Sequence, residues 1–179
     1  TAIDALTTSE VTMASASITV TDQITKAQAD TINGYTTGTV TPTSLTEDRA
    51  DIATLQSTAG ISLATTNITV TDQVTKAQVD TINGYTTGTV TLSSVVDTVA
   101  NITAIDALTT SEVNMASASI TVTDQVTKAN ADTINGYTTG QVTLTSVSDT
   151  VANITAIDAL TTSEVTMASA SITVTDQIT

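Results

Sequence analysis

The sequence contains no cysteine, no histidine, no tryptophan and no phenylalanine. Without cysteine it can form no disulfide, no thiolate metal site and no cysteine nucleophile. Without histidine it lacks the commonest general base and the commonest metal ligand. It also carries no glycine-rich phosphate loop and no Ser-His-Asp set. We therefore expect that the protein is not an enzyme and holds no organic cofactor.

Basic residues are almost as scarce. Four are present against 18 acidic ones, and the net charge is −14. Recognition of nucleic acids or anionic membranes needs clustered lysine and arginine, so neither partner is expected. No apolar run approaches the roughly 18 residues that a membrane span needs. The basic residues are Lys26, Arg49, Lys76 and Lys128.

Aromatic residues make up 2% of the chain, whereas hydrophobic residues in total reach 40%. Any core must therefore consist of valine, isoleucine, leucine, alanine and methionine. Threonine accounts for about a quarter of the sequence, and its β-branched side chain favours extended backbone. The composition predicts thin, regular layers that contain strands.

Repetition is the strongest feature that is present. Residues 1–25 and 155–179 are identical, and the phrase ITVTDQ returns with spacings of 50, 52 and 52 residues. A period of this size is typical of stacked repeat architectures. We interpret the chain as one continuous array and as a window on a longer 154-residue super-repeat. Its predicted parts are a partial unit 1–38, units 39–88 and 89–140, and a partial unit 141–179.

The unit 89–140 shows the expected local structure. Alternation predicts strands over 89–92, 112–118 and 119–124, with Val90 and Val122 facing inward. Helical spacing predicts one helix over 93–108 and a second over 125–137, with Ala129 turned inward. Asn135 and Gly136 are expected to end the second helix, since glycine accepts the left-handed conformation.

These elements predict an α/β solenoid of stacked units of about 52 residues, each with two parallel strand–helix coils. An all-β solenoid, with the helical segments as long arcs, is the alternative. The first unit differs from the others, because it contains Pro42, Arg49 and Gly60. It is also three residues shorter between Leu45 and Leu55, which predicts a shorter helix there.

Two motifs, VxDTxANI at 95–102 and 147–154 and the recurring ITVTDQxTKAxxDTI, resemble a known group of sequences. They are similar to the tandem repeats of very long secreted bacterial surface proteins, including type I secretion adhesins and cyanobacterial cell-surface proteins. The resemblance implies an extracellular, structural or adhesive role, and often calcium. The glycine-rich GGxGxD nonapeptides that bind calcium in many such proteins are absent here.

One aspartate closes each ITVTD phrase and recurs along the array. Stacked carboxylates beside threonine hydroxyls are candidate calcium ligands, since calcium takes six to eight oxygens. The alternative is a helix N-cap, because each aspartate precedes a predicted helix. The four candidates are Asp22, Asp72, Asp124 and Asp176.

Threonines also recur as T-x-T pairs, whose hydroxyls share one face of a strand. Such an array could bind ice or carbohydrate, or could simply be a solvated surface. Threonine and serine are also candidate sites for O-linked glycans. The pairs are Thr19/Thr21, Thr69/Thr71, Thr89/Thr91, Thr121/Thr123 and Thr173/Thr175.

The sequence therefore predicts a structural repeat segment of a long extracellular bacterial filament or cell-surface protein. Its partners would be neighbouring repeats of the same chain or like filaments. An adhesin spacer rigidified by calcium and a threonine-array binding surface remain alternatives. Joining Thr179 directly to Thr1 would skip about 26 residues of the repeat, so the sequence favours a continuous chain over end-to-end subunits.

Overall fold

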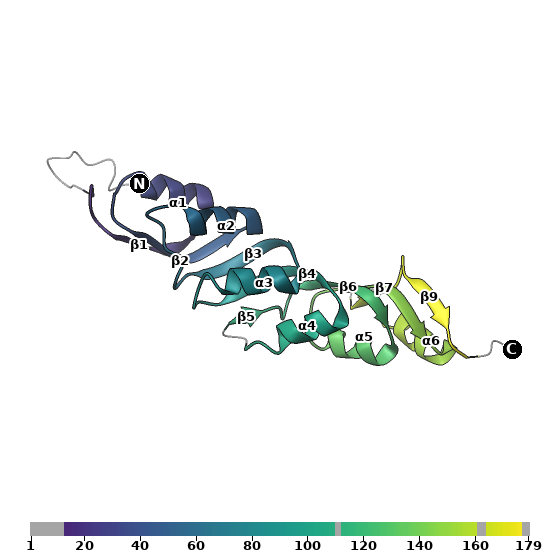
Figure 1. Cartoon of the computed structure of the whole chain (residues 1–179). Helices are drawn as coiled ribbons and strands as arrows, with labels where there is room; N and C mark the ends of the chain where they lie inside the picture. The colour runs from purple at the N-terminus through teal and green to yellow at the C-terminus, as the bar shows by residue number, and fades with distance from the viewer. Residues whose placement is uncertain (1–12, 110–111, 161–163, 177–179) are drawn as a thin grey trace.

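The computed structural model describes residues 13–109, 112–160 and 164–176. Figure 1 shows an elongated molecule in which a single open sheet runs from one end to the other, with β1 and β9 far apart. The strands are β1 Ile18–Ile24, β2 Val40–Glu47, β3 Asn67–Val74, β4 Val90–Asp97, β5 Val113–Asn114, β6 Ser119–Val126, β7 Val142–Asp149, β8 Val165–Thr166 and β9 Ser171–Val174. The helices are α1 Lys26–Asn33, α2 Arg49–Ser57, α3 Lys76–Asn83, α4 Val99–Asp106, α5 Lys128–Asn135 and α6 Val151–Asp158.

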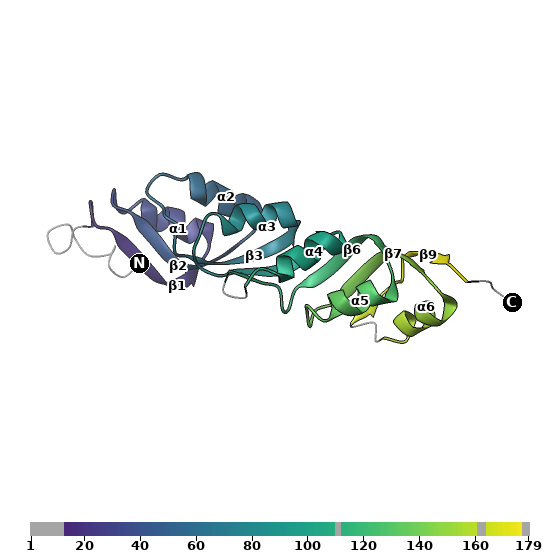
Figure 2. The same cartoon turned by 60° about the horizontal axis from the view of Figure 1, so that its bottom comes forward.

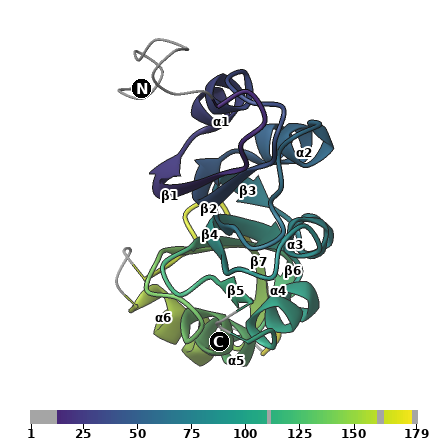
Figure 3. The same cartoon turned by 90° about the vertical axis from the view of Figure 1, so that its left-hand side faces the viewer.

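All strand pairs in the sheet are parallel. The order is β1-β2-β3-β4-β6-β7, with the short β5 beside β4, and with β8 and β9 beside β7. Each helix connects two strands, and each helix contacts the next one along the chain. The helices therefore lie along one face of the sheet and turn with it (Figures 2 and 3). This alternation of strand and helix rules out the all-β alternative.

Strand–helix pairs of two kinds alternate along the sheet. We call β1–α1, β3–α3 and β6–α5 the type 1 pairs, and β2–α2, β4–α4 and β7–α6 the type 2 pairs. The predicted units 39–88 and 89–140 each hold a type 2 pair followed by a type 1 pair. The pairing register shifts within the type 1 strand of each pair. In β3, for example, residues 68–70 pair with the start of β4, and after an irregularity Gln73 and Val74 pair with the middle of β4.

The core lies between the sheet and the helices. Alternate strand residues are buried, such as Ile68 and Val70 in β3, and they belong to the same hydrophobic core as Val79 and Ile82 of α3. The predicted inward residues Val90 and Val122 are fully buried. Burying a side chain of this size contributes about 1.5–3 kcal/mol, so aliphatic residues can hold this layer without aromatic ones.

The strands extend further than the sequence predicted, and the helices begin later. The segment 93–97, assigned to a helix, continues β4, and Val95 is buried as a strand residue. Likewise Val126 ends β6, so that α5 begins at Lys128 and buries Ala131 in place of the predicted Ala129. Apolar spacing of three and four residues near a boundary fits both periods, which explains the error.

Two further expectations about the connections are wrong. Asn135 and Gly136 do end α5 as predicted, but Gly136, like Gly84 after α3, has φ −69°, which is right-handed and not left-handed backbone. The first unit does not have a shorter helix, since α2 has nine residues and α4 has eight. The shortening falls between α2 and β3, where Gly60 adopts φ +85°, a conformation that favours glycine.

After each type 1 helix, a Thr-Thr-Gly segment forms hydrogen bonds with the residues that precede the strand of the same pair. In the second copy, the buried Thr86 hydroxyl donates to the Thr66 carbonyl at 2.6 Å. The Thr87 amide and hydroxyl both donate to the Ala64 carbonyl. A Cβ at Gly88 would lie 2.5 Å from the Thr66 carbonyl oxygen, so only glycine fits this approach.

The substitution Gly88→Ala should therefore destabilise the fold by about 1–3 kcal/mol, because backbone must move to admit the methyl group. The matched control is Gly84→Ala, where the added Cβ would meet Thr81 at an ordinary 3.4 Å. This control should be neutral or stabilising by up to about 1 kcal/mol. Urea denaturation followed by circular dichroism measures both, and equal effects would contradict the steric argument.

Candidate functional site

The site with the most regular chemistry is the contact between neighbouring strand–helix pairs at the helix N-termini. The first N–H groups of an α-helix have no partner within the helix. Here the residue before each helix supplies a local cap: Thr127, for example, accepts from the Asn130 amide, and Asn130 accepts from the Thr127 amide. These capping boxes leave the N–H of the first helical residue without a partner inside its own pair.

That N–H donates to a carboxylate on the next strand of the sheet. At the type 1 helices the acceptor is the last residue of the following type 2 strand. Such a bond places a negative charge at the positive end of a helix, where it is stabilising. The donor and acceptor pairs are Lys26 and Glu47 at 2.6 Å, Lys76 and Asp97 at 2.8 Å, and Lys128 and Asp149 at 2.8 Å.

At the type 2 helices the acceptor is the aspartate of the following ITVTD phrase. The donor and acceptor pairs are Arg49 and Asp72, Val99 and Asp124, and Val151 and Asp176, each at 2.9 Å. The predicted aspartates thus do bind helix N-termini, but not those of the helices that follow them in sequence. Asp72 and Asp124 lie where the register of their strands shifts. Thr25 and Thr127, not the aspartates, cap helices that follow ITVTD phrases.

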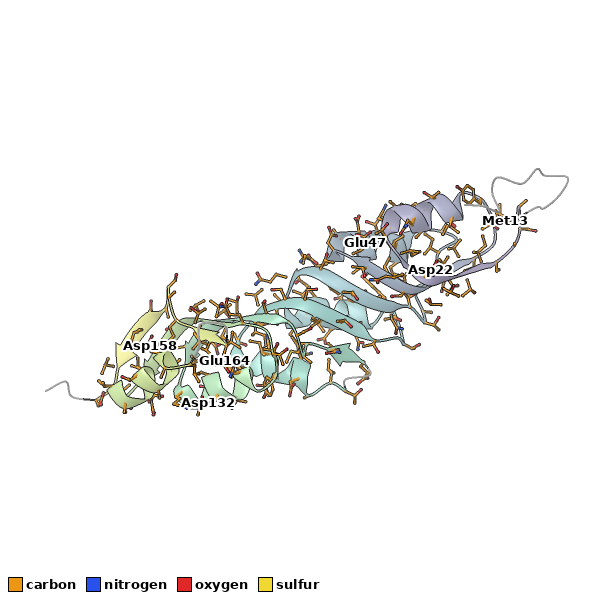
Figure 4. All side chains as sticks on the ribbon, turned by 180° about the vertical axis from the view of Figure 1, so that it is seen from behind. Met13, Asp22, Glu47, Asp132, Asp158 and Glu164 are labelled. Atoms are coloured by element: carbon orange, nitrogen blue, oxygen red, sulfur yellow. The ribbon has the colours of Figure 1, made fainter. Side chains whose placement is uncertain are left out.

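Asp22 is the exception among the four candidates. It lies in β1 at one edge of the sheet, and in the described part of the chain no helix precedes β1. Among those residues its carboxylate accepts no hydrogen bond, although it repeats the position of Asp72 and Asp124. Figure 4 labels Asp22 near Glu47, at the end of the ribbon that also holds Met13.

Calcium binding by these aspartates stays a prediction. Across residues 13–109, 112–160 and 164–176, no three acidic side chains gather in a geometry that could hold a metal ion. One carboxylate oxygen already accepts a backbone N–H in each of Asp72, Asp124 and Asp176. The other oxygen of Asp72 contacts the Arg49 guanidinium at 3.4 Å.

Hydrogen bonding changes the acidity of two of the contact carboxylates. Burial alone would raise the pKa of Asp97, but hydrogen bonds from the Asn101 side chain and from the Lys76 and Thr98 amides outweigh it and lower the pKa. The pKa of Asp149 is lowered by the equivalent bonds, first from the Lys128 amide and then from Asn153. Both groups therefore favour the charged form that the helix N-terminus binds.

The basic side chains are all engaged with aspartate. The three lysines each pair with the aspartate four residues later in their own type 1 helix, and Arg49 pairs with Asp72. Exposed pairs of this kind contribute at most about 1 kcal/mol. The lysine–aspartate ion pairs therefore lie within single helices, whereas the carboxylate–amide bonds join one strand–helix pair to the next. The lysine partners are Asp30, Asp80 and Asp132.

The predicted threonine arrays lie on the sheet in short rows. Thr69 is aligned with Thr46 on one side and with Thr91 on the other. A second row joins Thr121, Thr143 and Thr166. Each row spans three strands. In the next strand along the sheet the pairing is offset, so that its threonine is not aligned with the row. The structure thus brings threonines together locally, without one continuous lattice across the described strands.

The chain has no recognised similarity that would add to this geometry: no family model matches it, and neither a curated protein nor a solved structure does. Within the described residues, no helix has the length and apolar character needed to span a membrane. The contacts between pairs therefore carry the functional argument by themselves.

The substitution Asp124→Ala should destabilise the fold by about 1–2 kcal/mol, since it leaves the Val99 amide without its charged acceptor. Asp124→Asn keeps an acceptor oxygen and should cost less. Thr123→Ala, at the exposed neighbouring position, should stay within about 0.5 kcal/mol. Urea midpoints rank the three variants, and an equal cost for Asp124→Ala and Thr123→Ala would refute the role assigned to the carboxylate.

Stability should fall on acidification, mainly below about pH 4. The folded pKa values of Asp97 and Asp149 are lowered, so their contribution is complete above the ordinary aspartate pKa and is lost as pH drops through the folded values. Asp106 opposes this weakly, because burial raises its pKa. Urea unfolding at pH 7 and pH 3 measures the slope. The Asp97→Asn, Asp149→Asn double variant should show a shallower slope, and an unchanged one would count against this assignment.

Proposed function

We propose that this chain is a structural repeat segment of a long extracellular bacterial filament or cell-surface protein, built as an α/β solenoid of stacked units. The observation that carries the proposal is the recurring carboxylate–amide bond, which joins each described helix to the following strand–helix pair. A contact that repeats in the same form at every step is what an extendable array needs.

Burial supports the same function. Each pair covers its apolar face only against its neighbours, as in the contacts of α4 with α3 and α5. Stability in such an array is approximately a sum of units and interfaces, so length can change by whole units without redesign of a central core. The described acidic groups are used for this stacking or lie on the surface, which agrees with a mechanical role in a salty medium.

Deleting residues 89–140 tests the stacking directly. The deletion joins Gly88 to Gln141, which reproduces the Gly140–Gln141 junction and keeps the repeat in phase. The shortened chain should fold with native-like circular dichroism, and its length from small-angle X-ray scattering should decrease. The out-of-phase control, deletion of residues 89–126, should not fold cooperatively. If the chain lacking residues 89–140 does not fold, the solenoid proposal is contradicted.

Location at the cell surface needs its own measurement. An antibody against the 179-residue chain should label intact source cells, and the labelled polypeptide should run far above 18.2 kDa on a denaturing gel. Labelling only after permeabilisation would contradict the extracellular role. A band near 18 kDa would contradict the long chain.

A further inference from the structure

The contact between helices α2 and α3 differs from its counterpart between α4 and α5. In the α4–α5 contact the Tyr137 hydroxyl donates to the Thr103 hydroxyl at 3.4 Å. In α2 the position of Thr103 is taken by Ala53, which has no hydroxyl. The equivalent Tyr85 hydroxyl therefore makes no hydrogen bond with any described residue.

A small hollow opens on the surface beside this tyrosine. Binding sites for drug-sized molecules take about 300–1,000 Å³, whereas this hollow has a volume of about 80 Å³, enough for one small chemical group. Helices α2 and α3 contact described helices on both sides, α1 and α4, so the hollow does not lie at an end of the sequence. Its lining residues are Arg49, Ala53, Gln78, Thr81, Ile82 and Tyr85.

The lining side chains offer hydrogen-bond donors and one positive charge. The Arg49 guanidinium has five N–H groups, and only its Nε contacts a carboxylate, that of Asp72 at 3.4 Å. The Gln78 side-chain oxygen accepts from the Thr75 amide, while its NH₂ group has no partner among the described residues. With the Tyr85 hydroxyl, three donor groups meet at a hollow that no acidic side chain lines.

These donors are side chains, and the start of helix α2 adds nothing to them. The Asp51 amide already donates to Asp48, and the Arg49 amide already donates to Asp72. In α4 the position of Arg49 is taken by the uncharged Val99. The positive charge and the unbonded tyrosine hydroxyl thus occur together at the α2–α3 contact and not at the α4–α5 contact.

We propose that this hollow binds the carboxylate group of a small, singly charged acid. The planar guanidinium fork of Arg49 matches the two oxygens of a carboxylate, and the Gln78 and Tyr85 donors can reach its remaining lone pairs. The chain's net charge of −14 repels polyanions, which favours a ligand with one charge. Ile82 and the Tyr85 ring line the same hollow and offer apolar surface to the carbon skeleton of the acid. Binding here goes beyond the stacking proposed above and does not depend on it.

NMR titration of the 179-residue chain with sodium acetate tests the proposal. A ligand of so few atoms should bind with a dissociation constant of about 1–10 mM, and the amide signals of Arg49 and Tyr85 should shift. Two controls are matched to acetate: NaCl at the same concentrations for ionic strength, and acetamide as the neutral isostere. Signals that stay in place with acetate, or that shift equally with either control, would overturn recognition of a carboxylate.

Sodium glucuronate distinguishes two sources of the carboxylate. If the sugar ring contacts Ile82 and Tyr85, glucuronate should bind more tightly than acetate, which would identify a sugar acid as the ligand. Weaker binding of glucuronate, with acetate still bound, would identify a short free acid.

Exchange of residues between the two helix contacts gives matched variants. The double variant Arg49→Val, Ala53→Thr introduces the residues that α4 carries, so it should fold with a urea midpoint close to that of the wild type. Its dissociation constant for acetate should rise by about tenfold or more, since the charge and the fork are lost. Binding equal to that of the wild type would place the acetate elsewhere and overturn the site.

The reverse exchange keeps the proposal testable even if the first variant does not fold. Val99→Arg, Thr103→Ala should create a second acetate site, detected as a new shift of the Tyr137 amide. No gain there would show that these residues do not make the site. Arg49→Lys keeps the charge but loses the planar fork, so acetate binding should weaken several-fold. Unchanged binding by Arg49→Lys would contradict recognition by the guanidinium.

Discussion

The described structure depends on one recurring bond, in which a carboxylate on one strand receives the first backbone N–H of the helix in the preceding pair. A helix of eight residues is too short to be stable alone in water, and its terminal N–H groups must be satisfied from outside. Local threonine caps satisfy part of this need. The neighbouring carboxylate satisfies the rest, so no helix here is complete without the next strand.

This dependence explains why the sheet and the helices keep the same alternation along the array. In type 2 pairs the acceptor carboxylate belongs to the last residue of the strand, as at Asp97. In type 1 pairs it belongs to a residue at the register shift within the strand, as at Asp124. The type 1 strand β6 pairs through its first half with the end of β4, whereas with β7 it pairs along most of its length across a register shift. The offset makes the pairs unequal, and the unit of repetition is therefore two pairs and not one.

Sequence periodicity was sufficient to predict the α/β alternation and the inward position of Val90 and Val122. It misplaced the strand–helix boundaries, since Val95 fits both a strand and a helical spacing. It offered helix N-capping as an alternative to calcium binding for the ITVTD aspartates, but for the helices that follow them in sequence. A capping preference is local, whereas Asp124 acts on a helix 25 residues earlier. Only the parallel register brings the two together, and no local pattern encodes it.

The same bond explains how so acidic a chain folds with four basic residues. Six of its 18 acidic groups accept the first N–H of a helix in the preceding pair, and Asp48 caps its own helix. Three more pair with lysines of their own helices. A helix N-terminus carries roughly half a positive charge, so each strand–helix pair supplies a partner for the carboxylate of the next. Each of these carboxylates is thus stabilised locally by the N-terminus of a helix in the preceding pair. Because each strand–helix pair brings one acceptor and one donor, the same contact recurs at each described junction.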